Sequence, residues 1–383
     1  MKNTYKDAGY TYTINRLQET ARTFRNLGDA YGETNQKQTG FKRQLILAAD
    51  ILEECVAMNL DAKAPDKQER REFERKCMAM GISVKDVKLV DGKRREILVT
   101  AKTFMKGCVS ERVLRETVSS VFKAKFFSNQ DNRVIINEEP DQYVFYQENR
   151  FRILSGMARK CKEEENTSGD NFLLKKLNCG KMVAAIADGC GSGKRAFAES
   201  HMVIELMENC IEAGFEEKTA IDLINSAYIA GTTFNNPVTM DMSIIDCQAG
   251  VINCIKLGAV STFIKRENWV EIIKSTTLPM GVLEQVDYDC TTKKLYDGNY
   301  IIMISDGVLD NLSGINKEEQ MVEIINNINV KKPAGIAKKI LEESLKNHNM
   351  EAFDDCTVMV LGVFDTYAVS YTHLRAHETE ADL

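Results

Sequence analysis

The sequence predicts an α+β fold in which a helical segment and a small mixed unit precede a larger unit built on strongly apolar strands. Three observations lead to this expectation. The 383 residues exceed what one ordinary hydrophobic core organises and indicate two or three domains. Helical spacing and strand-like alternation follow one another up to about residue 148. Beyond residue 149 the strands become continuously apolar, and glycines recur beside aspartates at their ends.

The composition excludes several classes of function. The net charge is only −6 and charges of both signs are interspersed, so no basic face predicts nucleic-acid binding. No run approaches the roughly 18 apolar residues of a membrane helix, and Met1–Tyr10 lacks the apolar centre of a signal peptide. The 11 cysteines form no Cys-x-x-Cys pair, which is typical of reduced thiols. We therefore expect a cytoplasmic chain with no membrane segment and no nucleic-acid partner.

Residues 1–62 are expected to form a helical linker. Apolar residues between Leu45 and Met58 recur at helical spacing, and the intervening positions carry charged side chains. Such an amphipathic helix packs either as part of a core or as half of a coiled coil. The following segment, Asn59–Asp66, contains proline and aspartate and indicates a break in the helix.

Residues 63–148 are expected to form a small α+β regulatory domain without a recognisable chemical motif. Asp91-Gly92 lies between two alternating segments and predicts a β-hairpin. The helices are expected at Gln68–Met80 and Arg112–Phe122, and the strands at Ile82–Leu89, Arg95–Ala101, Arg133–Asn137 and Gln142–Gln147. A regulatory or protein-contact role follows by elimination.

Residues 367–383 have an unusual composition. They hold two of the chain's four histidines, His373 and His377, at a spacing that could place both on one face of a helix. However, Ser370–Thr379 resembles translated sequencing-adaptor sequence. We therefore expect a non-native tail and no metal site there.

Three apolar strands carry aspartates at one end. Lys181–Ala187 runs into Asp188, and Tyr300–Ser305 runs into Asp306. Asp354-Asp355 comes just before the third, Thr357–Val363. A carboxylate at the end of a buried strand is costly unless it is paired or metal-bound. A single Asp-Gly is ordinary turn chemistry, but three such strand ends indicate a site.

If these strand ends converge, they form an all-oxygen site of the kind that suits Mg²⁺ or Mn²⁺. Gly189 has no side chain, so its carbonyl could approach an ion closely. A helix is expected from Lys194 to about Ala213. The glycines before it match neither a dinucleotide-binding motif nor a P-loop, because Asp188 and Arg195 occupy positions that a P-loop gives to glycine and to serine or threonine.

Five short motifs occur in order within residues 149–366. They are Ser168–Phe172, Ala187–Ala196, Thr239–Asp246, Ile304–Gly307 and Asp354–Val358. Together they resemble the motifs of the metal-dependent protein phosphatases of type 2C (PP2C, also called PPM), and most closely a bacterial branch that acts in sporulation. The resemblance implies an α/β/β/α sandwich with two mainly antiparallel sheets, preceded here by the linker and the regulatory domain.

The resemblance also implies roles for particular residues. Asp188 would bridge two Mn²⁺ or Mg²⁺ ions, the Gly189 carbonyl would bind one of them, and Asp306 and Asp355 would bind the other. Asp170 would lie at the edge of the metal cluster. The catalytic carboxylates would thus be Asp188, Asp306 and Asp355. Arg195 would contact the phosphate or a switch helix. Asp354 and Asp241 would be structural or lie behind the ligands.

The implied reaction is direct hydrolysis of a phosphoserine ester by water, without a cysteine or histidine nucleophile. The implied substrate is a phosphorylated anti-anti-sigma protein of the STAS-domain type, whose dephosphorylation activates an early sporulation sigma factor. The N-terminal region would support a homodimer and contact a tubulin-like division protein. The full-length parent would be anchored in the membrane at the division septum. Cys190 stands where the family usually has methionine, and the family's membrane segment is missing.

Two alternatives remain at this stage. One is a stress-response phosphatase of the same branch, which a sensor domain in residues 1–148 would favour. The other is a catalytically silent module that binds a phosphoprotein without turnover. The filled acidic positions argue against the silent module.

Overall fold

The computed structural model describes residues 16–26, 45–53, 62–91, 95–104, 107–129, 131–163, 165, 167–177, 180–191, 193–230 and 236–366. Helices form over residues 16–26 and 45–53. The Arg25 guanidinium joins them, since its Nη2 lies 2.7 Å from Asp50 Oδ1 and 2.9 Å from Glu53 Oε2. Two sequence expectations, the end of the linker helix at Met58 and the tail at 367–383 with His373 and His377, lie outside the described residues.

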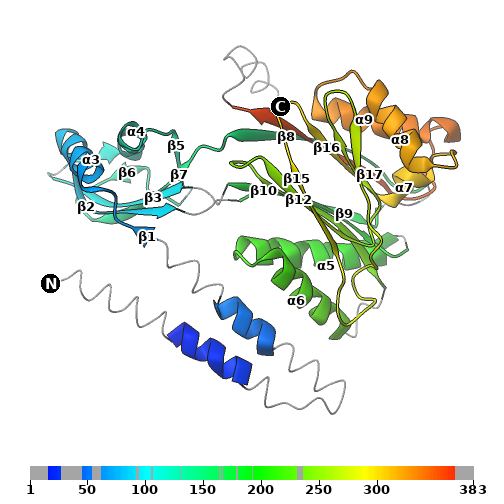
Figure 1. The fold of residues 1–383 in the computed structure, drawn as a ribbon, viewed down its shortest axis with the longest axis horizontal. Coiled ribbons are helices and arrows are strands. Elements are labelled where there is room, and N and C mark those ends of the chain that lie inside the picture. The colour runs from blue at the N-terminus through cyan, green and yellow to red at the C-terminus, as the bar shows by residue number, and fades with distance from the viewer. Residues whose placement is uncertain are drawn as a thin grey trace.

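The elements from β1 to β7 pack around one core, with α3 and α4 beside a five-stranded sheet (Figure 1). The sheet has the order β1-β2-β3-β7-β5, and two short strands, β4 and β6, pair separately. The bounds are β1 Ala62–Lys63, α3 Lys67–Ala79, β2 Ile82–Asp91, β3 Arg95–Thr103, β4 Val109–Ser110, α4 Glu111–Val121, β5 Phe126–Ser128, β6 Ile135–Ile136 and β7 Asp141–Gln147. The Asp66 side chain caps α3 by accepting from the amides of Gln68 at 2.6 Å and Glu69 at 2.9 Å.

The expected β-hairpin is confirmed, because β2 and β3 pair antiparallel from Ile82↔Thr103 to Asp91↔Arg95. Its turn residues, 92–94, lie outside the described ranges. Apolar side chains of α3 and α4, including Phe73 and Leu114, pack on the sheet against residues such as Ile97 and Phe145.

The rest of the chain forms two five-stranded antiparallel sheets with the orders β15-β12-β11-β10-β9 and β14-β13-β16-β17-β8. The first sheet and its helices comprise β9 Asp170–Lys176, β10 Lys181–Gly189, α5 Gly193–Glu212, α6 Glu217–Ala230, β11 Val238–Asp246, β12 Val251–Leu257 and β15 Asp289–Lys294. The second comprises β8 Phe151–Lys160, β13 Thr262–Lys265, β14 Val270–Ile273, β16 Tyr300–Ile304, α7 Asp306–Asp310, α8 Lys317–Asn327, α9 Pro333–Leu345 and β17 Cys356–Asp365, with a 3₁₀ turn at Lys346–His348.

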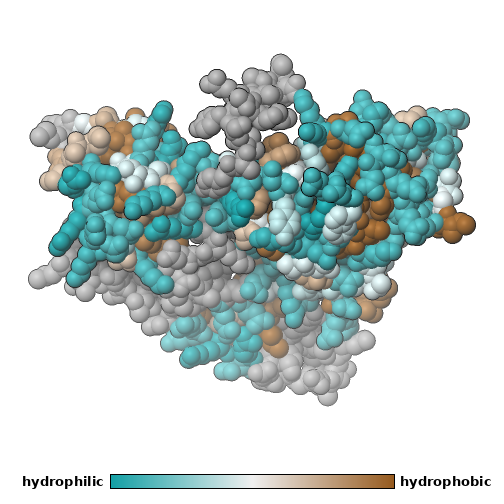
Figure 2. Space-filling view, turned by 45° about the horizontal axis from the view of Figure 1, so that its top comes forward, coloured by the Kyte–Doolittle hydropathy of each residue, from teal (hydrophilic) through white to brown (hydrophobic). Residues whose placement is uncertain are grey.

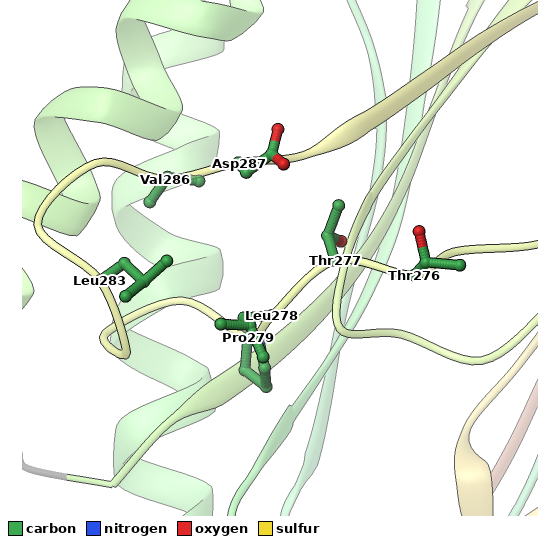
Figure 3. Close-up of a pocket in the computed structure, with 7 residues that line it drawn as sticks. All are labelled: Thr276, Thr277, Leu278, Pro279, Leu283, Val286 and Asp287. Atoms are coloured by element: carbon green, nitrogen blue, oxygen red, sulfur yellow. The ribbon is translucent and has the colours of Figure 1, made fainter.

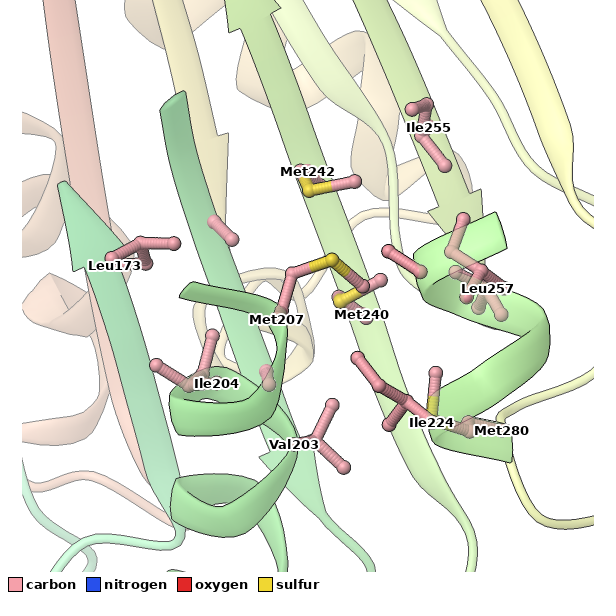
Figure 4. Packing of buried hydrophobic residues seen from close by; sticks show 14 of the residues in the cluster. Leu173, Val203, Ile204, Met207, Ile224, Met240, Met242, Ile255, Leu257 and Met280 are labelled. Carbon is pink, nitrogen blue, oxygen red and sulfur yellow. The ribbon is translucent and has the colours of Figure 1, made fainter. Parts of the chain in front are cut away.

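Three buried clusters hold four layers together. One, with Ile186, Ile252 and Met359, lies between the two sheets. A second packs α5 and α6 onto the first sheet and includes Met207 and Met240 (Figure 4). A third packs α7, α8 and α9 onto the second sheet. This helix–sheet–sheet–helix order confirms the α/β/β/α sandwich expected from the sequence.

Close backbone contact between α9 and β8 depends on glycine. A Cβ atom at Gly156 would lie 2.0 Å from the backbone nitrogen of Ala334, so only glycine fits there. On the face drawn in Figure 2, hydrophilic side chains cover most of the surface and apolar ones form separate groups. No helix within the described ranges is long and apolar enough to cross a bilayer.

Candidate active site

The two sheets bring acidic strand ends together around one cavity. Asp188 lies at the end of β10, Asp306 at the start of α7 two residues after β16, and Asp354 just before β17. All three line a cavity of about 360 Å³. The complete lining is Lys162, Asp188, Cys190, Gly191, Pro237, Thr239, Pro279, Asp306 and Asp354, and we call this space the acidic cavity. Carboxylates from both sheets therefore face a single space.

Burial and mutual repulsion favour the protonated forms of these carboxyl groups. Burial raises the pKa of Asp188 to about 9, and the charges of Asp170, Asp306, Asp354 and Asp355 add to the effect. Burial likewise raises the pKa of Asp306, with Asp354 contributing. A bound cation would reverse this preference, because it stabilises the ionised carboxylates that otherwise repel one another.

Asp170 lies beside Asp188, as its direct partner in the pairing of β9 with β10. It is 1% exposed, and burial raises its pKa to about 7. Its Oδ2 accepts a hydrogen bond from the Thr357 hydroxyl at 2.7 Å, whereas its buried Oδ1 has no hydrogen-bond partner. A buried oxygen without a partner indicates a place for a water molecule or an ion.

Asp354 and Asp355 are neighbours, but they face different surroundings. Asp354 is half-buried and lines the acidic cavity. Asp355 is 3% exposed and is absent from the cavity wall. Its Oδ1 accepts from the amide of Lys162 at 3.0 Å and its Oδ2 from the amide of Gly169 at 2.7 Å. Asp355 therefore ties both ends of the β8–β9 connection, and the geometry favours Asp354 for the cavity-facing role that the sequence interpretation gave to Asp355.

Gly189 closes the end of β10 against the start of α5. A Cβ atom there would lie 2.3 Å from the carbonyl oxygen of Ala196, so no larger residue fits. A bulkier side chain would push the helix away from the strand that carries Asp188. This gives the glycine a packing reason that is independent of any role for its carbonyl.

Arg195 does not line the acidic cavity. Its side chain is 63% exposed, and its Nε lies 3.3 Å from Oε1 of the fully buried Glu199. Glu199 Oε2 accepts from Asn236 Nδ2 at 3.2 Å, and the carbonyl of the next residue, Pro237, accepts from the Cys190 amide at 3.1 Å. Arg195 and Glu199 thus connect α5 to a wall of the cavity rather than to its interior.

Behind the carboxylates lies a smaller cavity of about 40 Å³, whose lining includes Asp188, Asp306 and Asp241. Asp241 is 2% exposed, and its Oδ2 lies 2.8 Å from Nζ of the fully buried Lys256. The Lys256 ammonium also donates to the Val260 carbonyl at 2.6 Å. Asp241 is therefore one half of a buried ion pair, which agrees with the structural role expected for it.

The residues around the acidic cavity suit a hard divalent cation. The donors are carboxylate oxygens, one of them buried without a hydrogen-bond partner. Among the described residues no three histidine, cysteine or acidic side chains already surround a single point as metal ligands. Binding an ion also requires these carboxyl groups to ionise, which burial and mutual repulsion oppose while the site holds no cation.

Sequence reasoning missed two features of this site. Lys162 is the basic residue in the cavity wall. Thr357 on β17 donates to the Asp170 carboxylate, and Ser305, which follows β16, donates to the Asp355 carbonyl. Thr357 follows the Asp354-Asp355 pair within one motif and could have been noticed. Lys162 is one of several basic residues near the end of β8, and nothing in the pattern separates it from Arg159 and Lys160.

Comparisons with known proteins give mutually consistent matches. The family model of stage II sporulation protein E (SpoIIE) matches residues 178–364. Stage II sporulation protein E of Bacillus subtilis (strain 168) is 30% identical over 258 residues, which are 66% of this chain and 31% of that protein. The Priestia megaterium protein of the same name is 34% identical over 211 residues, 55% of this chain and 36% of that protein. The chain thus spans about a third of the length of these relatives.

A solved structure agrees with these sequence matches. It contains the PP2C phosphatase domain and a fragment of the regulatory domain of SpoIIE from Bacillus subtilis. It superposes with a TM-score of 0.59 at 26% identity, and the match covers 87% of this chain and 99% of that one.

Proposed function

We propose that this chain is a PP2C-type serine/threonine phosphatase of the stage II sporulation protein E family and that residues 149–366 hydrolyse phosphoserine esters in the acidic cavity. The observation that carries the proposal is the meeting of Asp188, Asp306 and Asp354 in one cavity between two sheets. Such clustering is costly without a cation, so it is expected where a cation and a phosphoryl group bind.

Each carboxylate has a distinct part in this proposal. Asp188, Asp306 and Asp354 hold two divalent cations, Mn²⁺ or Mg²⁺, with the Gly189 carbonyl as a further donor and Asp170 at the edge. When bound, such ions neutralise phosphoryl charge and make water a stronger nucleophile. Asp355 holds the backbone at Lys162 and Gly169, and so fixes the loop that leads to Asp170. Lys162 contributes a positive charge at the rim, where a phosphate enters.

The substrate proposed is a serine-phosphorylated anti-anti-sigma protein of the STAS-domain type, whose dephosphorylation activates an early sporulation sigma factor. Family membership supports this choice. A homodimer, a contact between the N-terminal region and a tubulin-like division protein, and septal anchoring of the full-length parent are proposed on the same ground. Arg195 contributes to switching by linking α5, through Glu199, to the cavity wall.

Phosphate release from a serine-phosphorylated anti-anti-sigma protein tests the proposal. The native chain is compared with Asp188→Ala and Asp306→Ala, with Mn²⁺, with Mg²⁺ and without added metal. We expect metal-dependent release that falls by about 100-fold or more in both variants, because each removes a charge that the cations need. Asp131→Ala, an exposed aspartate outside the sandwich, is the matched control and should keep full activity.

The opposite outcome is equally informative. If the folded native chain binds the phosphoprotein stably and releases no phosphate at any metal concentration, the chain is a binding module and the enzymatic proposal is wrong. Release that survives in both variants would move the reaction away from the acidic cavity.

A further inference from the structure

A second, smaller hollow adjoins the acidic cavity. It lies in the connection between β14 and β15 and has a volume of about 120 Å³. We call this space the loop hollow. Its lining residues are Thr276, Thr277, Leu278, Pro279, Leu283, Val286 and Asp287 (Figure 3). Pro279 lines both spaces, so the two are separated by little more than this residue.

The wall of the loop hollow is largely apolar but open to solvent. Leu278 is 50% exposed and Leu283 is 47% exposed, and neither belongs to a buried hydrophobic cluster. Figure 3 shows Leu283 and Val286 on one side and Thr276 and Thr277 on the other, with Leu278 and Pro279 between them. Small-molecule sites usually measure about 300–1,000 Å³. The loop hollow is therefore too small for a ligand of that kind and has the size of one side chain.

The loop hollow is held in shape from the opposite side. The fully buried Asn225 on α6 donates from Nδ2 to the carbonyls of Leu283 at 2.9 Å and Glu284 at 3.3 Å, and its Oδ1 accepts from the Gly281 amide at 2.9 Å. Met280 pairs with Val238 at the start of β11 through two backbone hydrogen bonds of 2.9 and 3.1 Å. The apolar wall is thus preorganised, which lowers the conformational entropy that the loop must lose when a ligand binds.

We propose that the loop hollow receives one aliphatic side chain that lies close in sequence to the phosphoserine of the substrate protein. This inference rests on the proposed function. A phosphoserine in the acidic cavity places the residues on one side of it over Pro279, because the two spaces share that residue. The two leucines in the wall then favour an aliphatic residue beside the phosphoserine. The hollow therefore recognises the substrate sequence around the phosphoserine, and the acidic cavity recognises the phosphate.

The test uses synthetic phosphoserine peptides in a glycine–serine background and the full chain. One leucine is placed in turn at each position within about four residues of the phosphoserine, since an extended chain covers about 3.3 Å per residue. At one of these positions we expect kcat/KM to exceed that of the leucine-free peptide by about 10-fold. The preference should disappear in the Leu278→Ser/Leu283→Ser double variant.

Two controls separate selection from general damage. Hydrolysis of p-nitrophenyl phosphate, which has no flanking residues, should be unchanged in the double variant. Ile315→Ser changes a fully exposed apolar residue between α7 and α8 and should leave the leucine preference intact. If the chain hydrolyses no ester, the proposed function fails, and equilibrium binding of the same peptides then tests the hollow separately.

Four results would overturn the inference. The leucine preference could persist in the double variant, or no position could show a preference by kinetics or by binding. Hydrolysis of p-nitrophenyl phosphate could fall as much as peptide hydrolysis, which would make the loop a wall of the acidic cavity only. A preference for lysine that is lost in Asp287→Asn would show that the hollow takes a basic side chain instead.

Discussion

The small unit from β1 to β7 and the sandwich from β8 to β17 use the same construction but bury different chemistry. Both pack helices on antiparallel sheets through apolar clusters. In the small unit the buried polar residues are two threonines and Glu111, which accepts from Asn132 at 3.3 Å. The sandwich buries six ionisable side chains; they are Asp170, Glu199, Asp241, Lys256, Asp355 and Asp365.

This difference indicates that the sandwich is less stable than an equally large apolar core would make it. A buried ion pair rarely stabilises a fold as well as apolar residues of the same volume. Three buried carboxylate oxygens of the sandwich, Glu165 Oε2, Asp170 Oδ1 and Asp241 Oδ1, also lack any hydrogen-bond partner. An arrangement that weakens the fold in this way indicates chemistry at that place. The small unit has no such cluster among its described residues.

The largest effect is expected at the buried pair of Lys256 and Asp241. Lys256→Met leaves the Asp241 carboxylate buried beside the carboxylates of the acidic cavity, which should lower the free energy of unfolding by about 3–5 kcal/mol. Denaturant unfolding measures the change. Arg112→Ala in the small unit breaks an exposed pair with Glu116, in which Arg112 is 74% exposed, and should change the free energy of unfolding far less.

A double variant decides whether the lost charge balance is the cause. Adding Asp241→Leu to Lys256→Met removes the stranded carboxylate and should restore most of the stability. The contrast between the two units breaks down if Lys256→Met and Arg112→Ala cost the same, or if the second substitution deepens the loss.

The fold was more predictable than the detail of the site. The apolar strands at Lys181–Ala187 and Tyr300–Ser305 and the helix after Lys194 have strong local patterns, and each is present. The meeting of Asp188 with Asp306 depends on two sheets stacking, which no local pattern encodes. The sandwich was therefore expected from resemblance alone, and the stacked sheets in the structure confirm it.

The choice between adjacent aspartates was beyond the sequence. Neighbouring residues before a strand point in different directions, and only the position of the β8–β9 connection decides which one meets a backbone amide. The amides of Lys162 and Gly169 approach Asp355 and leave Asp354 facing the cavity. The ion pair that turns Arg195 toward Glu199 is visible in sequence only as an i, i+4 spacing.

Substituting Asp354 and Asp355 one at a time tests which of the two faces the cavity as a working ligand. Asp354→Asn should lower kcat by about 100- to 1,000-fold with little loss of stability, because it removes a cavity charge. Asp355→Asn should act mainly on the fold, since one amide oxygen can still accept but the other position now presents a donor to a backbone N–H. Activity assays and thermal unfolding of both variants measure the two effects.

A clear reversal is possible for this pair. If Asp355→Asn abolishes metal-dependent turnover at full stability while Asp354→Asn keeps it, Asp355 is the cavity ligand, as the sequence interpretation had it. The closed loop would then have to open when metal binds.

The smallest effect concerns the pH dependence of stability without metal. The folded-state pKa values are about 9 for Asp188 and about 7 for Asp170, both raised from 3.8. A raised pKa means that the folded chain holds these protons more tightly than the unfolded chain. The resulting stabilisation is complete below about pH 4 and is lost as the pH rises through 7 and then 9. The metal-free chain should therefore lose stability across this window.

Asp188→Asn isolates this contribution from all other titrating groups. The amide cannot ionise, so the metal-free variant should have a higher Tm than the native chain at pH 8, by about 2–4 °C for each kcal/mol recovered, and a similar Tm near pH 4. Saturating Mn²⁺ should raise the Tm of the native chain by binding only the folded state, and should raise that of the variant much less. Thermal unfolding at both pH values measures this. A Tm difference that does not change with pH would mean that Asp188 is ionised without metal, and the carboxylates would then be balanced by charges within the protein, as Asp241 is by Lys256.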